Sequence, residues 1–190
     1  QPNQSLEIMN TEKAFSIEID EFTIKGTIDR IDLIKGQKRI IDYKTSNSSK
    51  PPRNTHLLSA NTKKEPTHLP EEAYYSLGDK NYYWSNLQLP LYCYSEVSEE
   101  NKSLPELYYY NVPKSAEKTT FALWENFSHE NLNSARECAK GILKCIKEGK
   151  FWPPNEQLDK RMDEFADLFP DGIKKTVDGS KFENYKFKQE

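Results

Sequence analysis

Apolar and polar residues alternate through the first quarter of the chain, which is the pattern of β-strands with one buried face. The alternation over residues 15–19 resumes after Asp20-Glu21 and predicts a hairpin at that point. Residues 22–33 and 38–44 are rich in Ile, Leu, Phe, Tyr and Thr, and Gly36-Gln37 between them supplies a residue that tolerates the positive φ of a tight turn. The sequence therefore predicts two successive hairpins.

Helical spacing begins further along the chain. An apolar helix is predicted to start near residues 85–86 and to run to about Ser98, so that Pro90 falls close to the first turn, where proline is tolerated. Gln88 and Tyr92 are four residues apart and therefore share one face of this helix. The alternative is that Tyr92 belongs to the core and Gln88 is solvated.

The rest of the chain predicts scaffold elements. Residues 107–112 and 119–124 are expected to form later strands. Ser128 is a favourable N-cap for a helix through Glu148, and Gly149 would end that helix. Apolar residues at 158, 162, 165 and 169 recur at helical spacing and predict a short amphipathic helix.

The second hairpin brings three functional side chains together. With Gly36-Gln37 as the loop, the numbers of paired residues sum to 73, which places Asp29 opposite Lys44, diagonal to Asp42 and on the same face as both. Asp32 falls on the other face, but a loop one residue longer, or a bulge near Asp29, would exchange the two aspartates. The pattern favours Asp29 and leaves Asp32 open.

Two carboxylates and a lysine converging on one face are typical of a divalent-metal phosphodiesterase. The alternative is that these residues form solvent-facing ion pairs on an edge strand. Asp42 argues against this alternative because it follows Arg39-Ile40-Ile41, a run expected to be buried, and buried carboxylates usually have a partner or a metal.

Net charge is unevenly distributed over the 190 residues. The formal net charge is -3, yet residues 35–64 hold eight basic residues against one acid, Asp42, so this segment carries +7 and the remaining chain -10. Phosphate attraction depends on the local field more than on the total charge, and Lys50, Arg53, Lys63 and Lys64 are therefore candidate nucleic-acid contacts. A solvated lysine-rich loop is the alternative.

Residues 46–71 are rich in Ser, Asn, Thr, Pro and Lys, and predict a long polar loop or insertion next to these aspartates. The aromatic residues that follow it at 74, 75, 82, 83 and 84 could stack on unpaired bases or could pack in the core. His56 and His68 lie in this loop without a motif partner, and His129 follows the N-cap candidate Ser128, so none is expected to ligate a metal. A polar tail is predicted for residues 174–190.

Three strings of residues resemble one family. Gly26-Thr27-Ile28-Asp29-Arg30-Ile31-Asp32, then Ile41-Asp42-Tyr43-Lys44-Thr45, then Gln88 with Tyr92, are similar in order and spacing to the RecB-like nuclease branch of the PD-(D/E)xK superfamily. The similarity covers roughly residues 15–153 and is greatest to the C-terminal nuclease domains of RecB and AddB helicase-nucleases. It implies an α/β (α+β) fold of the restriction-endonuclease type, with a mixed β-sheet flanked by helices.

The resemblance also implies the roles of individual residues. Asp29, Asp42 and the carbonyl of Tyr43 would ligate Mg²⁺ or Mn²⁺, and Lys44 would orient or activate the attacking water. Gln88 and Tyr92 match the family's downstream Gln-x-x-x-Tyr motif, which supports the active site and the DNA.

The implied function is metal-dependent DNA cleavage. The expected protein is an exonuclease on single strands, joined to a helicase domain or subunit in double-strand-break repair and recombination. A stand-alone restriction-type or phage-type nuclease is the first alternative. A nuclease-like module that binds DNA or braces a partner without cleaving is the second.

Two features depart from the family pattern. Members usually carry a His or Glu metal ligand on a helix upstream of the first motif, whereas Glu7, Glu12 and Glu18 lie where strands are predicted. Together with Gln1 at the start, this suggests a fragment that lacks an upstream helix. AddB-type relatives often hold an iron-sulfur cluster, but Cys93, Cys138 and Cys145 are too few and too widely spaced, so no cluster is expected and the cysteines are predicted to be core residues.

Length and composition fit one domain over residues 1–190. The sequence has no apolar run of transmembrane length, no signal peptide and no paired cysteine pattern, which together favour a cytoplasmic protein without a membrane partner. It also lacks a glycine-rich phosphate loop, so this chain itself is not expected to hydrolyse ATP.

Overall fold

A computed structural model describes residues 6–45, 50–60, 69–98, 103–150 and 166–178. Its elements, in chain order, are β1 Leu6–Ile19, β2 Phe22–Ile34, β3 Gln37–Lys44, α1 Arg53–His56, β4 Leu57–Ser59, the short 3-10 helix η1 Glu71–Ala73, β5 Tyr74–Leu77, β6 Lys80–Trp84, α2 Gln88–Glu96, β7 Glu106–Asn111, η2 Ala116–Lys118, β8 Thr120–Leu123, α3 His129–Lys147, η3 Ala166–Leu168 and α4 Ile173–Thr176.

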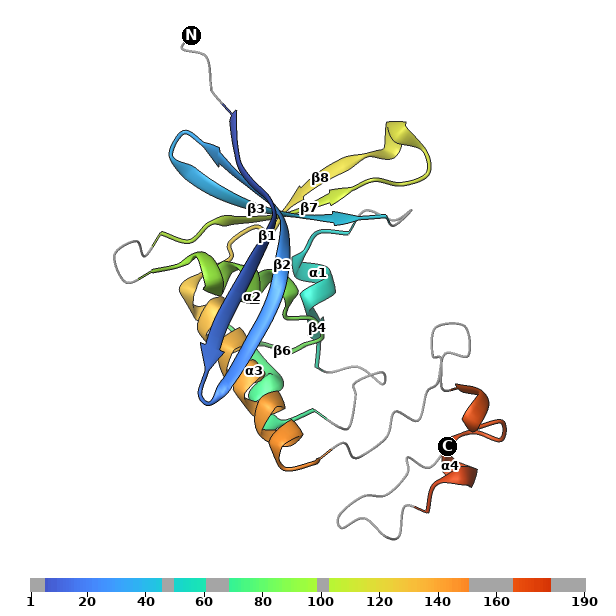
Figure 1. The fold of residues 1–190 in the computed structure, drawn as a ribbon. Coiled ribbons are helices and arrows are strands. Elements are labelled where there is room, and N and C mark those ends of the chain that lie inside the picture. The colour runs from blue at the N-terminus through green and yellow to red at the C-terminus, as the bar shows by residue number, and fades with distance from the viewer. Residues whose placement is uncertain (1–5, 46–49, 61–68, 99–102, 151–165, 179–190) are drawn as a thin grey trace.

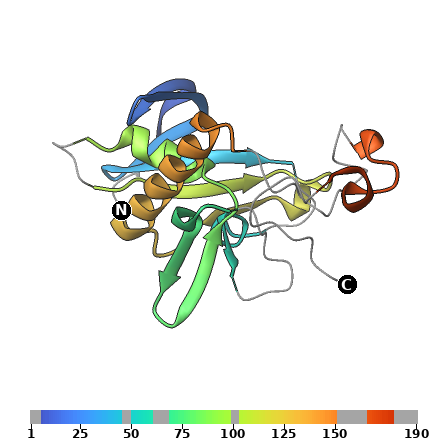
Figure 2. The same cartoon turned by 90° about the horizontal axis from the view of Figure 1, so that it is seen from below.

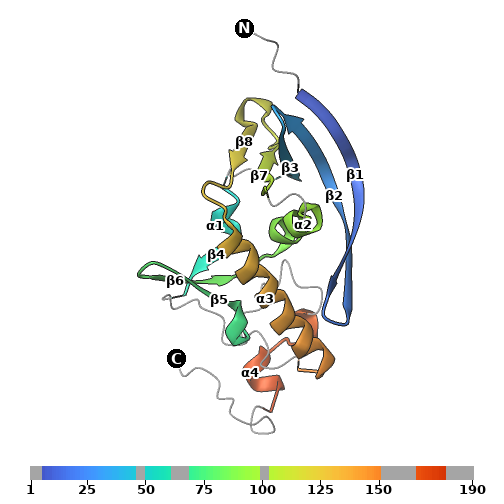
Figure 3. The ribbon, with the colours of Figure 1, turned by 90° about the vertical axis from the view of Figure 1, so that its left-hand side faces the viewer.

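The main sheet has five strands in the order β1-β2-β3-β7-β8 (Figure 1). Strands β3 and β7 run parallel, and every other neighbouring pair is antiparallel. Helices α2 and α3 pack on one face of this sheet, where their apolar residues join the core (Figure 3). The mixed sheet flanked by helices confirms the predicted restriction-endonuclease-like α+β fold.

The core is built from one side of the central strands. Ile31, Ile40 and Leu107 are at most 1% exposed and pack with Leu89 of α2 and Cys138 of α3. The opposite face carries aromatic residues, including a stacked pair formed by the buried Tyr108 and the exposed Phe121 with ring centroids 4.2 Å apart. The face of β3 that α2 and α3 cover is therefore the core face of the sheet.

The β1–β2 hairpin is longer than the rest of the sheet and lies alongside α3 (Figure 1). Ile17 and Ile19 of this hairpin pack against Ala139 of α3, and Glu21 at its turn forms an ion pair with Lys147. The alternation over residues 15–19 and the turn at residues 20–21 are thereby confirmed.

The predicted loop over residues 46–71 is only partly a loop. Its described part contains α1 and β4, and β4 pairs with β6 in a second sheet of order β4-β6-β5 that projects below the main sheet (Figure 2). The polar composition hid these elements because they are short. Tertiary contacts, such as those of the fully buried His56, stabilise them.

Helix α3 begins and ends where the sequence predicted. Ser128 and Asn131 form a reciprocal capping box, and Gly149 adopts a positive φ of 66° just beyond the C-terminus. Asn131 Nδ2 also donates to Tyr75 Oη at 3.1 Å, which ties this helix start to the second sheet. The amphipathic helix expected at 158–169 lies mostly outside the described residues. Residues 179–190 of the predicted tail also lie outside them.

Candidate active site

The register of the β2–β3 hairpin differs from the predicted one. Ile34 pairs with Gln37, so the loop is Lys35-Gly36 and paired numbers sum to 71. Lys35 and Gly36 both have positive φ, as a two-residue hairpin loop of this kind requires. Continuing the ladder places Asp29 level with Asp42, not opposite Lys44. The shift is two residues, so the prediction that all three share one face survives.

The two aspartates of the first motif have different partners. Asp29 Oδ2 accepts a hydrogen bond from the Tyr43 backbone N–H at 2.9 Å, which fixes its carboxylate at the end of the β2–β3 ladder. Asp32 is buried on the other face, where Arg30 binds both of its oxygens at 2.7 and 2.9 Å. The register pairs Asp32 with Arg39, on the face opposite to Asp42, so Asp29 is the aspartate that lies beside Asp42.

Asp42 is a buried carboxylate whose bonding is incomplete. Its residue is 2% exposed, and Lys44 Nζ lies 2.6 Å from its Oδ2. Apart from this ion pair, Oδ2 has no hydrogen-bond partner among the described residues. Burial raises the pKa of Asp42 and Asp29 raises it further, while Lys44 lowers it without cancelling the shift. A divalent cation would satisfy this oxygen, since such ions prefer carboxylate ligands.

Lys44 is held by groups from two neighbouring elements, α2 and β7. Its Nζ donates to Gln88 Oε1 at 2.9 Å and lies 5.0 Å from the centre of the Tyr109 ring. Gln88 Nε2 in turn donates to Tyr92 Oη at 2.9 Å. The Gln88 amide therefore has one orientation, with its oxygen toward the lysine and its nitrogen toward the tyrosine. The prediction that Gln88 and Tyr92 point together is confirmed, and the solvated alternative for Gln88 is wrong.

The Tyr92 hydroxyl is buried within the electrostatic influence of three acidic side chains. The residue is 7% exposed, and burial raises the pKa of its hydroxyl. The Gln88 hydrogen bond opposes this shift, and the carboxylates of Asp42, Asp29 and Glu12 each add a smaller increase to the pKa. Because Tyr92 Oη accepts from Gln88, its own proton remains for a further acceptor.

Gly26 of the first motif has a packing role. It pairs with Phe15 across the β1–β2 ladder, and a Cβ at Gly26 would lie 2.6 Å from Phe15 Cε1. The Phe15 ring, which covers this glycine, meets Tyr92 edge-on with ring centroids 5.4 Å apart. The absence of a side chain at Gly26 therefore lets an aromatic ring brace Tyr92 from the far strand.

The far end of α2 is anchored by charge. Glu96 forms ion pairs with Lys13 of β1 and with Lys38 of β3, the latter at 2.9 Å. Burial raises the pKa of Glu96, but the two lysines together lower it below its ordinary value. This clamp joins the last turn of α2 to the two strands that flank β2.

Glu12 is the upstream acid nearest to this cluster. It lies between the pairs formed by Thr11 with Arg30 and by Lys13 with Ile28, so it is level with Asp29, and it has a positive φ of 51°. Its carboxylate is exposed on a strand, not on a helix. Within the described residues no three His, Cys, Asp or Glu side chains are already arranged as a metal site.

The predicted nucleic-acid contacts are only partly placed. Lys50 is exposed, and the Arg53 guanidinium lies 4.7 Å from the centre of the Tyr82 ring. Lys63 and Lys64 lie outside the described residues. Of the neighbouring aromatic residues, those at 75, 83 and 84 are buried, which supports the core alternative, whereas Tyr74 is 40% exposed.

Two groups beside the site were missed or undervalued. Asn111, level with Lys44 on β7, is 2% exposed, and its Nδ2 has no hydrogen-bond partner in the described part of the chain. His56 was assigned to a polar loop without a motif partner, yet it is fully buried beneath the site. For Asn111, its place near the end of a predicted strand was the only signal in the sequence.

The three cysteines differ in burial. Cys93 and Cys138 are fully buried, which confirms their predicted core position, and burial raises the pKa of each thiol to about 12. Cys145 is half-buried, so its assignment to the core was only partly right.

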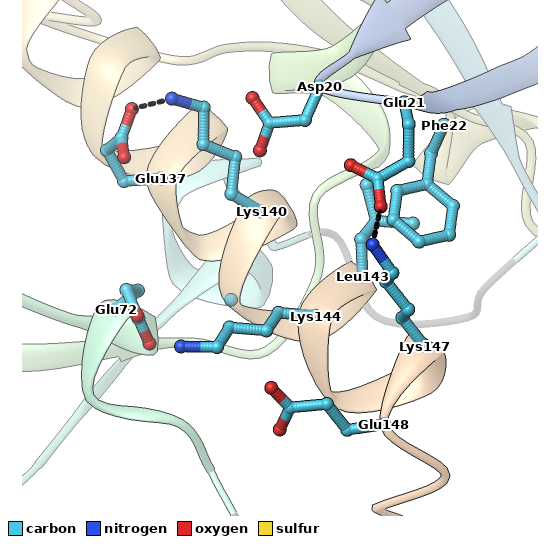
Figure 4. Close-up of a pocket in the computed structure, with 11 residues that line it drawn as sticks. Asp20, Glu21, Phe22, Glu72, Glu137, Lys140, Leu143, Lys144, Lys147 and Glu148 are labelled. Atoms are coloured by element: carbon cyan, nitrogen blue, oxygen red, sulfur yellow. Dashed lines mark hydrogen bonds and ion pairs between the residues drawn. The ribbon is translucent and has the colours of Figure 1, made fainter.

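A cavity of about 580 Å³ lies elsewhere, between the β1–β2 turn and α3 (Figure 4). Its lysines lie among acids: Lys140 pairs with Glu137 at 3.0 Å, Lys147 pairs with Glu21, and Lys144 points toward Glu72. Five acids and three lysines line the cavity, so it lacks the net positive field that a phosphate would require.

Comparison with known proteins identifies the family but no individual relative. No curated protein and no solved structure matches the chain. None of the helices in the described ranges has the length and apolar character needed to cross a bilayer. The sequence model of the PD-(D/E)XK nuclease superfamily matches residues 1–189. The chain therefore belongs to the PD-(D/E)XK nuclease superfamily, whose members are typically metal-dependent nucleases.

Proposed function

We propose that this chain is a metal-dependent deoxyribonuclease whose active site is formed by Asp29, Asp42 and Lys44, with Gln88 and Tyr92 in support. The observation that carries the proposal is the buried carboxylate of Asp42: its Oδ2 forms an ion pair at 2.6 Å with a lysine held by Gln88 and has no other partner among the residues that the structure describes. Such an arrangement has a cost in stability that a bound cation would offset.

The chain's own groups divide the work of phosphodiester hydrolysis. Asp29, Asp42 and the Tyr43 carbonyl are the oxygen ligands for Mg²⁺ or Mn²⁺. When bound, the cation polarises the phosphate and lowers the pKa of the attacking water. Lys44 orients that water and stabilises the negative charge that develops on the phosphate.

Gln88 and Tyr92 act on the position of Lys44 and of the substrate. The Gln88 amide holds Nζ through its oxygen, and the same amide leaves the Tyr92 proton available for a phosphate oxygen. Both come from α2, so their separation is set by the helix itself.

Glu12 supplies the acid that the family normally carries upstream. Its place opposite Asp29 and its action on Tyr92 support a role as a third carboxylate near the cation. A strand would then replace the usual helix as the source of this ligand.

The biological setting follows from the order of the three motifs. Their resemblance to RecB and AddB supports a single-strand exonuclease that acts with a helicase domain or subunit in double-strand-break repair and recombination. Lys50 and Arg53, with Lys63 and Lys64, would attract the DNA backbone. The alternatives are a stand-alone nuclease of restriction or phage type and a module that binds DNA without cleaving it. The experiment below separates cleavage from binding alone.

The test is cleavage of end-labelled single- and double-stranded DNA with Mg²⁺, Mn²⁺ or EDTA. Wild type is compared with Asp42→Ala and Lys44→Ala. The proposal expects metal-dependent cleavage that both substitutions abolish, and the labelled products report polarity and strand preference. Salt-sensitive DNA binding without cleavage would instead favour the binding module.

A further inference from the structure

His56 lies at the junction between the second sheet and the active site. The residue is fully buried, at 0% exposure. Its Nδ1 is 2.9 Å from the Pro52 carbonyl oxygen, and its Nε2 accepts a hydrogen bond from the Leu89 backbone N–H at 3.4 Å. A backbone N–H can only donate, so Nε2 carries no proton and the Nδ1–H donates to Pro52.

The bond from Leu89 N–H to His56 Nε2 satisfies one of the free N–H groups at the start of α2. The first N–H groups of a helix have no partner within the helix and need one from outside. Here Gln88 N–H donates to Asn86 Oδ1 at 2.8 Å, Leu89 N–H donates to His56, and Pro90 has no N–H to satisfy. Leu91 N–H returns to the Leu87 carbonyl at 2.9 Å. The N-cap residue makes no side-chain cap of its own, so His56 and Asn86 together fix where the helix begins.

A second set of contacts links His56 to Lys44 from below. Nδ1 lies 3.2 Å from Tyr109 Oη and 3.1 Å from Thr55 Oγ1, and Thr55 donates to Tyr109 at 3.0 Å. Lys44 Nζ lies over the ring of this same Tyr109. The imidazole thus contacts both supports of the lysine: the helix that carries Gln88 and the ring beneath Nζ.

We propose that His56 is a positioning residue of the active site, which sets the placement of Lys44 through the start of α2 and through Tyr109. The inference rests on the proposed nuclease function for its kinetic consequence, but its structural part does not. A histidine that merely filled core volume would be replaceable by an apolar residue of similar size without an effect on Lys44.

The arrangement requires a neutral imidazole. Protonation would place an Nε2–H against the Leu89 N–H, so two donors would face each other. Burial lowers the pKa of His56 to about 4, with Lys44 adding to the lowering and the Pro52 hydrogen bond opposing it. Its other charged or titratable neighbours are Tyr109, whose pKa is raised to about 12 mainly by burial, and, beyond that ring, Asp42.

The test compares three substitutions at one position. His56→Leu removes both polar contacts, His56→Asn keeps a group near Nδ1, and His56→Gln keeps an acceptor that can reach Leu89 N–H. With end-labelled single-stranded DNA and Mn²⁺, His56→Leu is expected to lower kcat by about 10²-fold with KM little changed. His56→Gln should retain more of kcat than His56→Asn. Equal kcat in all three variants and wild type would overturn the proposal.

Two controls separate positioning from loss of stability. Ser85→Ala removes the hydrogen bonds from Ser85 Oγ to the Thr55 and His56 carbonyls, which belong to the backbone of α1 and not to the imidazole or to α2, and it should leave kcat unchanged. In a double-mutant cycle with Gln88→Ala, His56→Leu should cost much less than it does alone, because its route through Gln88 is already gone. Fully additive losses would contradict that route.

A readout without activity distinguishes the failure of this inference from that of the proposed function. Amide hydrogen exchange at Leu89 should accelerate in His56→Leu, and the Lys44 side-chain NMR signals should shift there but stay close to wild type in His56→Gln. If wild type cleaves no DNA, these signals still decide the matter. Unchanged Leu89 exchange and Lys44 signals in His56→Leu would overturn the positioning role.

Discussion

Acid should destabilise this protein through a single buried histidine, by an amount that the structure sets. The pKa of His56 is 6.5 in its ordinary state and about 4 in the fold. Because the folded value is the lower one, the unfolded chain binds the proton first, and stability is lost as pH falls through this window. The difference of about 2.5 units corresponds to about 3 kcal/mol of unfolding free energy between pH 7 and pH 4.

The assay is urea unfolding followed by tryptophan fluorescence at a series of pH values, for wild type and His56→Gln. Trp124 reports on the site because its ring lies 4.9 Å from the imidazole. Asp42 acts in the opposite direction, since its raised pKa makes its protonation stabilising as pH falls, but this effect is shared by both proteins and cancels in the comparison. Between pH 7 and pH 4, the unfolding free energy of wild type should fall by about 3 kcal/mol more than that of His56→Gln. Parallel curves would refute the reasoning.

Three further outcomes follow from the site. Asp42→Asn should raise the melting temperature in EDTA, because burial of the charge outweighs its attraction to Lys44, and should abolish the stabilisation by Mn²⁺; a lower melting temperature in EDTA would contradict this. Gly26→Ala should cost about 1–3 kcal/mol in urea unfolding because Phe15 must move, and an unchanged midpoint would show that the ring yields freely. Glu12→Gln should raise the Mn²⁺ concentration for half-maximal cleavage by about tenfold, whereas an unaltered metal titration would remove Glu12 from the site.

Much of the scaffold could be predicted because it depends on local chemistry. The alternation over residues 15–19 and the cap at Ser128 were sufficient to locate one hairpin and one helix. The face shared by Asp29, Asp42 and Lys44 was also predicted correctly, because the observed register differs from the predicted one by two residues and a strand alternates with a period of two.

The register and the surroundings of the site could not be obtained in that way. The hairpin loop is Lys35-Gly36, in which Lys35 adopts a positive φ. Lysine rarely has this conformation, so the sequence did not predict Lys35 as a loop residue. His56 lies in a polar segment, and only contacts with residues more than thirty positions away reveal that it is buried. Long-range packing of this kind leaves no periodic trace in the sequence.

The most direct test of the site is the comparison of Asp29→Asn with Asp32→Asn in metal-dependent DNA cleavage. Both changes remove one carboxylate from the same strand, three residues apart, and urea unfolding confirms that each variant is folded at the assay temperature. The account predicts that Asp29→Asn abolishes cleavage in Mg²⁺ and Mn²⁺, while folded Asp32→Asn retains it, because Asp32 binds Arg30 on the opposite face. Loss of cleavage in Asp32→Asn with activity kept in Asp29→Asn would contradict the assignment of the site.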